Sequence, residues 1–150
     1  MRKLGTRGIA PLLAVGAISL ATQLIPREWI RSVASSDSPS GEFWTVVPGS
    51  IYDGDTLQVQ QGSTVEKIRL CGIDAPEKAQ PLGIEARDRL AQLLEAGELI
   101  VEPVERDRYG RLVAELWTAD THINSHLVAD GMAYHYAQYS DSCPNKVALA

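Results

Sequence analysis

The sequence predicts an α+β fold, mainly β, in which five strands form a Greek-key barrel (the OB-fold) with two or so helices beside it. The order of the segments predicts it: three strand-like segments, a helical one, two more strand-like segments and a second helical one. The length of 150 residues suits one domain and is too short for two well-packed cores. No internal repeat competes with this interpretation.

The first three predicted strands lie between residues 44 and 73. Residues 44–47 form a short strand that ends at a Pro-Gly turn, and residues 57–60 alternate apolar side chains with glutamines. Gly62-Ser63 then predicts a turn into residues 65–73, where apolar and charged side chains alternate again. These three segments predict an antiparallel meander.

The pattern changes to a helical one over residues 81–96, where leucines and alanines recur at a spacing near 3.6 and Gly97 marks the end. The elements predicted after it are strands at 99–104 and 112–117, a helix at 123–130 and an irregular tail from residue 139.

The N-terminal segment, residues 1–34, has the pattern of a signal peptide or a membrane anchor. Residues 8–25 carry no charge and follow Arg2, Lys3 and Arg7. A run of 18 residues is short for a membrane span, which favours cleavage, and an uncleaved anchor stays open. Either alternative places the remainder outside the cytoplasm. Residues 35–42 are rich in serine and predict a flexible linker, and residues 43–150 predict the folded domain.

The exported part is acidic. After residue 34 the chain has nine Lys and Arg against 18 Asp and Glu, so a surface that coats nucleic acid generally is excluded and phosphate binding needs a local site. The two cysteines, Cys71 and Cys143, are an even count in an oxidising compartment, which favours one disulfide over two independent thiols.

Two acidic motifs are candidates for chemistry. Asp53-Gly54-Asp55-Thr56 is by itself mostly a turn sequence, because aspartates in turns bind the backbone. Asp74-Ala75-Pro76-Glu77 ends the third predicted strand, where Pro76 stops the strand and makes a rigid corner. The turn near Gly62 folds the second strand along the third, so we expect the carboxylates of Asp55, Asp74 and Glu77 to converge.

Three converging carboxylates repel one another unless a cation joins them, and Ca²⁺ is the hard, oxygen-seeking candidate. Arg69 lies on the same third strand, and Arg111 follows the charged turn 107–110. Each arginine has a simpler interpretation as a surface ion pair or a turn residue. Near an acid-bound metal, however, two guanidinium groups suit a phosphodiester, because they bind phosphate oxygens in a bidentate way.

The ordered set of DGDT, IRLCGIDAPE and DRYGR resembles the staphylococcal nuclease (thermonuclease) family over about residues 44–145. The resemblance implies that Asp55 and Asp74 bind Ca²⁺ through carboxylates and Ala75 through its backbone carbonyl oxygen. It implies a general base at Glu77 and phosphate-binding, catalytic arginines at Arg69 and Arg111.

The same resemblance implies hydrolysis of DNA and RNA on the 5′-oxygen side, which leaves 3′-phosphate ends. Tyr109 and Tyr139 match tyrosines that line the family's nucleotide pocket, and Asn124 matches a structural asparagine. The sequence departs from the family after Asn145, where the family's long C-terminal helix is expected to be largely missing. A Cys71–Cys143 disulfide would offset part of the lost stability, by about 2–4 kcal/mol.

His122 and His126 have the spacing of a helical zinc pair. The glutamate of the His-Glu-x-x-His pattern is absent, so surface or capping histidines are favoured over a zinc site. The leading hypothesis is therefore a monomeric, exported, Ca²⁺-dependent nuclease that needs no protein partner. A nucleic-acid-binding OB module without catalysis is the alternative, and a tethered interaction domain with purely structural acids is a third.

Overall fold

The computed structural model describes residues 39–150. The predicted signal peptide or anchor at 1–34, and the first half of the predicted linker at 35–42, lie outside the described residues. Within residues 39–150 no helix has both the length and the apolar character needed to cross a membrane.

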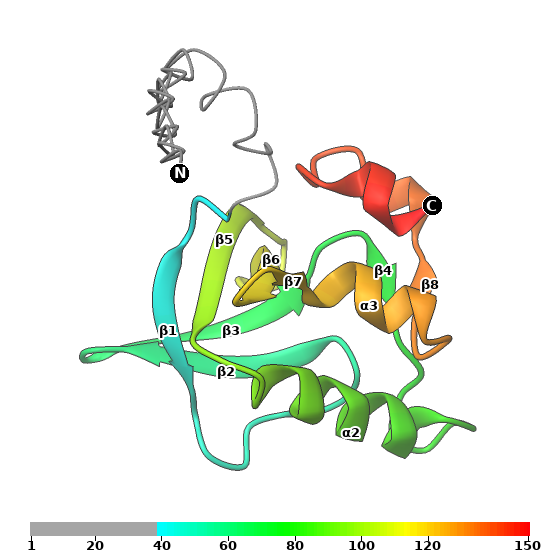
Figure 1. Cartoon of the computed structure of the whole chain (residues 1–150), viewed down its shortest axis with the longest axis horizontal. Coiled ribbons are helices and arrows are strands. Elements are labelled where there is room, and N and C mark those ends of the chain that lie inside the picture. Colours follow the sequence, from blue (N-terminus) through cyan, green and yellow to red (C-terminus); the bar gives the residue numbers. More distant parts are fainter. Residues whose placement is uncertain (1–38) are drawn as a thin grey trace, which may run out of the picture. The chain divides into compact units, whose positions relative to one another are not determined.

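Five strands make up the barrel: β1 (Glu42–Val46), β2 (Thr56–Gln61), β3 (Thr64–Leu70), β5 (Leu99–Arg106) and β6 (Leu112–Thr118) (Figure 1). Antiparallel pairs run in the order β3-β2-β1-β5-β6, and a parallel β3–β6 pairing closes the sheet on itself. A two-residue strand, β7 (Thr121–His122), pairs antiparallel with the end of β6. The predicted fold class, a five-stranded Greek-key barrel, is confirmed.

The barrel strands form because their apolar side chains alternate, so that one face of each strand fills the interior. Four apolar residues on β2 and β3 are fully buried, Leu57, Val59, Ile68 and Leu70, while Gln58 and Lys67 point outward. Burying each such aliphatic side chain contributes about 1.5–3 kcal/mol relative to leaving it exposed. This alternation is the signal by which the sequence predicted both strands.

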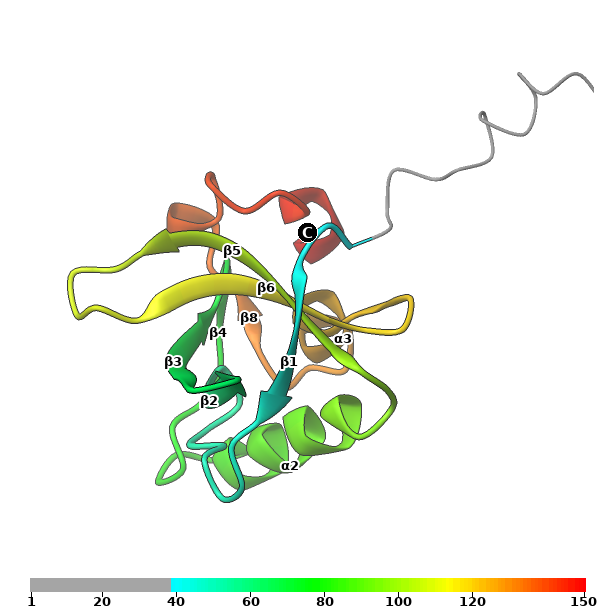
Figure 2. The same cartoon turned by 90° about the vertical axis from the view of Figure 1, so that its left-hand side faces the viewer.

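Two helices flank the barrel. Helix α2 (Gly83–Leu94) packs Ala86 and Leu90 into the core, and α3 (Ile123–Ala129) packs Ile123 and Leu127. Figure 1 shows α2 and α3 beside the barrel, and Figure 2 shows the β5–β6 hairpin extending beyond it. The sequence predicted both helices, the first two residues longer at each end than observed and the second one residue longer at its end.

The third predicted strand is divided in the structure. Gly72 has a left-handed φ of 70° and separates β3 from a short strand, β4 (Ile73–Asp74). A Cβ at this position would lie 2.6 Å from Leu149 Cδ1 and 3.0 Å from Cys143 Sγ, so only glycine fits without displacement.

The C-terminal region contains short elements that the sequence did not predict. Strand β8 (Tyr134–His135) pairs antiparallel with β4, and two 3₁₀-helices follow, η1 (Ala137–Tyr139) and, within the tail predicted to be irregular, η2 (Lys146–Leu149). The pairing of β4 with β8 fixes Asp74 opposite Tyr134, and Leu149 at the end of η2 is buried in the core. The tail therefore forms one wall around the end of β3.

Two connections tie this end of β3 to the rest of the domain. The fully buried Asn124 accepts a hydrogen bond from the Leu116 amide at 3.1 Å and donates one to the Cys71 carbonyl at 3.0 Å. A disulfide joins Cys71 to Cys143. Asn124 therefore has a structural role here, and the cysteine pair anchors the tail.

We expect Cys143→Ser to lower the free energy of unfolding by about 2–4 kcal/mol, because the disulfide constrains the unfolded chain. Urea unfolding of the oxidised protein measures this change. Reduced wild type should match Cys143→Ser, and reduction should leave the variant unchanged. Equal stability of oxidised wild type and variant would contradict the prediction.

Candidate active site

Strand β3 places Arg69 between the two parts of the candidate site. The β2–β3 register sets Arg69 opposite Thr56, directly after Asp55, and the β3–β6 register sets it opposite Val113, two residues after Arg111. Barrel closure therefore brings the acidic turn and the arginine-bearing hairpin to the two sides of one residue.

The Asp55 carboxylate is buried and fully engaged. Its Oδ1 accepts a hydrogen bond from the Thr56 hydroxyl at 2.9 Å, and its Oδ2 accepts one from the Ala75 amide at 2.7 Å. Gly54 permits this approach, since a Cβ there would lie 2.7 Å from the Cβ of Ala75. The Asp53 carboxylate accepts a hydrogen bond from the Asp55 amide, which fixes the turn.

Arg69 forms ion pairs with two carboxylates at once. One end of its guanidinium contacts Asp55 Oδ2, and Nη2 lies 2.7 Å from Asp74 Oδ1. Arg69 and Asp55 are largely buried, whereas the Asp74 side chain keeps 58% of its surface exposed. Two of the three predicted carboxylates thus converge, and the cation that joins them here is Arg69.

The third carboxylate does not join them. Glu77 is exposed, and its side chain makes no hydrogen bond or ion pair within residues 39–150; only its backbone is held, by Gln80 Oε1 at 2.8 Å. No group of three or more His, Cys, Asp or Glu side chains in this part of the chain is placed to hold a metal. The expectation that all three carboxylates meet at one point was wrong.

The β5–β6 hairpin positions Arg111. The Asp107 carboxylate accepts hydrogen bonds from Arg111 Nε at 2.6 Å and from the amides of Arg111 and Tyr109 at 2.9 Å. Arg106 braces the same turn, because its guanidinium bonds both Glu66 carboxylate oxygens on β3 and the Gly110 carbonyl. The Arg111 guanidinium lies 5.5 Å from the centre of the Tyr109 ring.

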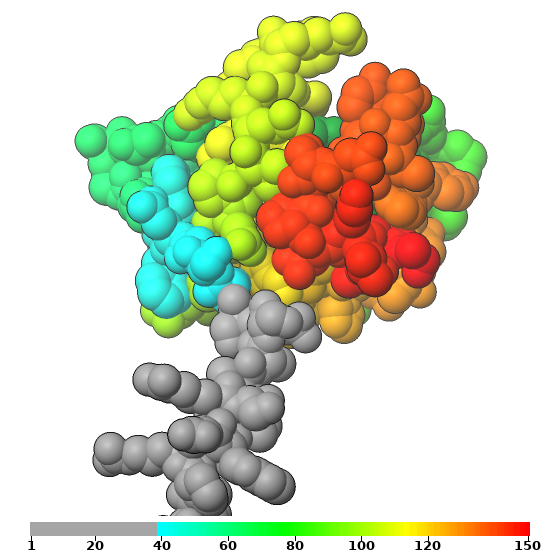
Figure 3. Space-filling model, turned by 90° about the horizontal axis from the view of Figure 1, so that it is seen from above, coloured from blue at the N-terminus to red at the C-terminus, as the bar shows by residue number. Residues whose placement is uncertain are grey.

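One pocket of about 380 Å³ gathers four of the predicted residues: Arg69, Tyr109, Arg111 and Tyr139. Tyr136 also lines it, packs edge-on against Tyr139 at 4.8 Å between ring centres, and was missed by the sequence analysis. In Figure 3 the yellow hairpin tip and the orange tail project at the same edge of the molecule. The pocket joins three exposed tyrosine rings to four arginine side chains, Arg69, Arg106, Arg108 and Arg111.

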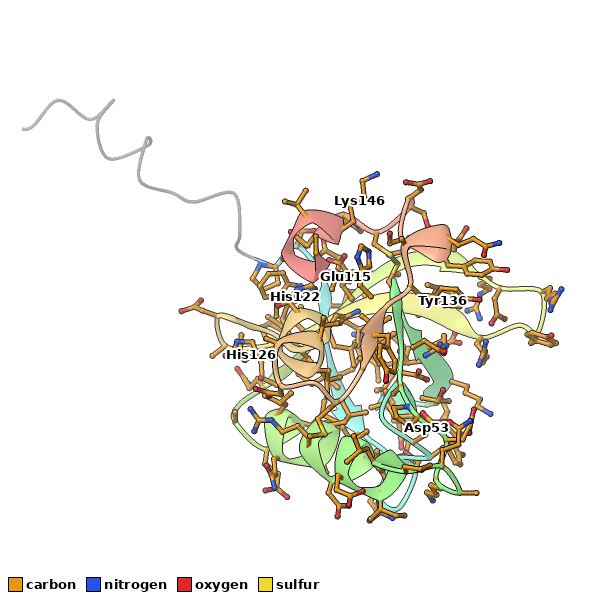
Figure 4. The ribbon with its side chains drawn as sticks, turned by 90° about the vertical axis from the view of Figure 1, so that its right-hand side faces the viewer. Asp53, Glu115, His122, His126, Tyr136 and Lys146 are labelled. Carbon is orange, nitrogen blue, oxygen red and sulfur yellow. A yellow bond between two sulfur atoms is a disulfide. The ribbon has the colours of Figure 1, made fainter. Side chains whose placement is uncertain are left out.

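The histidines lie apart from this pocket. His122 is buried with its Nε2 3.5 Å from Glu115 Oε2, and its ring packs against Trp117 at 4.6 Å. His126 is exposed, and Figure 4 shows it on the outer side of α3, away from Glu115. Since no metal-binding group of three occurs in residues 39–150, the structure gives no support to a zinc pair.

Comparison with known proteins agrees with this geometry. The family described as Staphylococcal nuclease homologue matches residues 67–149, more than half of the chain. The chain belongs to this family. The resemblance expected from the motifs is therefore confirmed, and the matched range of this nuclease homologue includes Arg69, Asp74, Glu77 and Arg111.

Curated relatives of this nuclease homologue carry related names. An "Uncharacterized endonuclease" of Escherichia coli O157:H7 is 36% identical over 91 residues, which are 60% of each chain. The "Micrococcal nuclease" of Shigella flexneri is 40% identical over 98 residues, 59% of this chain and 56% of its own. A "Probable staphylococcal-like nuclease" of Oryza sativa is 38% identical over 73 residues, 49% of this chain and 22% of its own. The chain thus spans about 60% or less of the length of these relatives.

Burial raises the pKa of Asp55 to about 6, against the lowering effects of Arg69 and of the hydrogen bond from the Ala75 amide. Because this pKa lies above the value of about 3.9 in an unfolded chain, the group stabilises the fold fully below about pH 4. That contribution is lost as the pH rises through about 6.

We therefore expect the stability of wild type relative to Asp55→Asn to fall between about pH 4 and pH 6 and to level off above. Urea unfolding of both proteins across this range, without added metal, measures the difference. If the stability difference is constant or rises with pH, burial is not the main influence on the pKa of Asp55.

Proposed function

We propose that this protein is a Ca²⁺-dependent phosphodiesterase that cuts DNA and RNA. The observation that carries the proposal is the position of Arg69, which is joined to Asp55 and Asp74 and lines one pocket with Arg111. Relatives named endonuclease and micrococcal nuclease support the same class of activity.

The two arginines suit a phosphodiester group. Arg69 enters the pocket from β3 and Arg111 enters it from the hairpin, so a phosphate between them meets guanidinium groups from two sides. Planar guanidinium groups bind phosphate oxygens in a bidentate way and stabilise the charge that develops on them during attack. Asp107 keeps Arg111 in place through the Nε contact, which leaves its terminal nitrogens for the phosphate.

The acidic corner fits Ca²⁺ by its donor chemistry, because carboxylate and carbonyl oxygens are the ligands this ion prefers. Asp55 and Asp74 would hold the ion with the carbonyl oxygen of Ala75, and two carboxylates that already share one cation show that their charges converge. When bound, Ca²⁺ supplies positive charge that polarises the phosphodiester.

Glu77 is the proposed general base. Its carboxylate is exposed and unengaged within residues 39–150, so it is free to accept a proton from the attacking water. Attack with loss of the 5′-oxygen leaves a 3′-phosphate end, the outcome that the family resemblance implies. The three tyrosine rings at the pocket suit the sugar and base of the bound nucleotide.

The proposal includes an exported protein, secreted or held on the outer side of the cytoplasmic membrane, that acts as a monomer. The charge pattern of residues 1–34 supports export, and the Cys71–Cys143 disulfide is typical of an oxidising compartment.

The full chain should cut single-stranded DNA and RNA with millimolar Ca²⁺ and lose this activity in excess chelator. We expect Arg111→Ala to lower kcat about 10²–10³-fold, because a donor to the developing charge is lost. Glu77→Gln should lower kcat about 10²–10⁴-fold through loss of the base. Gel assays of labelled oligonucleotides measure both effects and the end groups of the products.

Arg87→Ala is the matched control, because Arg87 pairs with Asp88 on α2 and lies outside the pocket. Arg69→Lys keeps the positive charge but cannot make the bidentate contact. A lower kcat in this variant would therefore show that the bidentate contact is needed and not the charge alone. Cutting that resists chelator would exclude the metal. Binding without cutting, unchanged in Glu77→Gln, would favour the non-catalytic OB module.

Ca²⁺ affinity should also depend on pH, because the ion displaces the proton of Asp55. Since the Asp55 pKa is about 6, we expect the affinity to fall by up to about tenfold per unit below that pH. Calorimetric titration with Ca²⁺ between pH 5 and pH 8 measures it. An affinity unchanged between pH 7 and pH 5 would exclude Asp55 as a ligand.

A further inference from the structure

The distribution of unpaired cations points to a second contact surface for the substrate. Residues 39–150 contain nine lysines and arginines. Six of them form ion pairs with carboxylates: Arg69, Arg87, Arg89, Arg106, Arg111 and Lys146. In this part of the chain only Lys67, Lys78 and Arg108 have no carboxylate partner.

Two of these cations lie beside the candidate active site. Arg108 lines the tyrosine pocket and Lys67 lies two residues before Arg69 on β3, whereas Lys78 lines a different pocket together with Arg87. A protein with 17 acids and nine bases in this region would be expected to neutralise most surface cations. Cations left available beside one site therefore favour a polyanion that extends past it.

Lys67 has an aromatic partner. Its Nζ lies 4.9 Å from the centre of the Tyr52 ring, a cation–π contact at the surface. Tyr52 is held by its amide, which donates to the Thr56 carbonyl at 2.9 Å, and its side chain remains 38% exposed. A positive charge beside an exposed aromatic ring is the combination on which single-stranded nucleic acid is bound.

This pair lies on the opposite side of Arg69 from the tyrosine pocket. The pocket lies toward β6, which pairs with one edge of β3. Tyr52 precedes β2, which pairs with the other edge and sets Gln58 opposite Lys67. Lys67 and Arg69 share the outward face of β3, about 7 Å apart along the strand. A single strand of nucleic acid that leaves the pocket and passes Arg69 would therefore reach Lys67 and Tyr52 next.

We propose that Lys67 and Tyr52 form a second nucleotide subsite, in which Lys67 contacts a phosphate and Tyr52 stacks on a base of single-stranded nucleic acid. The inference rests on the proposed function, since it extends the substrate beyond the scissile phosphate. The domain as a whole is acidic, so nucleic acid would contact it only along β3 and the β5–β6 hairpin.

The test compares a long ligand with a short one. Binding of a labelled 12-nucleotide single strand and of a nucleoside 3′,5′-bisphosphate is measured on the full chain in excess chelator. Tyr52→Leu should weaken binding of the 12-mer about tenfold, and Tyr52→Phe should restore it. Lys67→Gln should reduce the slope of log affinity against log salt by about 0.7, the value for one phosphate contact.

Both variants should bind the bisphosphate as wild type does. Lys146→Gln is the control for charge, because Lys146 pairs with Asp141 and lies at the opposite end of the molecule from Asp53 in Figure 4. If Tyr52→Leu and Lys67→Gln bind the 12-mer with wild-type affinity and wild-type salt slope, the subsite is refuted and the proposed function is not. An equal loss for both ligands would also overturn the subsite, since Tyr52 would then act only through the Asp55 turn. A wild type that binds neither ligand and cuts no nucleic acid would instead refute the proposed function.

Discussion

The ion pair between Arg69 and the buried Asp55 is the interaction on which the rest of the site depends. A carboxylate removed from water is costly unless a cation and hydrogen-bond donors compensate it, and here both are supplied, by β3 and by the Ala75 amide. The same arginine reaches Asp74, so the two acidic motifs are held at a fixed separation. A site assembled around one guanidinium group also keeps that group beside the phosphate it is proposed to bind.

Closure of the barrel gives this arginine its second set of neighbours. The parallel β3–β6 pairing joins segments more than 40 residues apart in the chain and brings the hairpin of Arg111 next to Arg69. Asn124 and the disulfide secure the end of the same strand. Structural and proposed catalytic residues are thus concentrated on β3 and its continuation, where a small displacement would affect both.

The sequence predicted those parts of the fold that carry a regular pattern. Alternating side chains predicted β2 and β3, and the turn near Gly62 predicted that Asp55 and Asp74 approach each other, as the structure shows. The β4–β8 pairing was not predictable, because two-residue strands have no periodicity, and Tyr136 at the pocket depends on it. Glu77 is exposed and lies in a loop held by Gln80, for which no motif gives a signal.

The disulfide has a consequence for a chain that has been cut. Cys71 and Cys143 enclose most of the domain in one covalent ring, which includes α2, the exposed hairpin tip and α3. A single protease cut at Tyr109 would leave two fragments still joined through sulfur, with Arg69 and Arg111 on opposite fragments. A cut at the Gly62 turn lies outside the ring, so the segment before it would be held only by its strand pairing and packing. The molecule therefore tolerates a nick on one side of Cys71 far better than on the other.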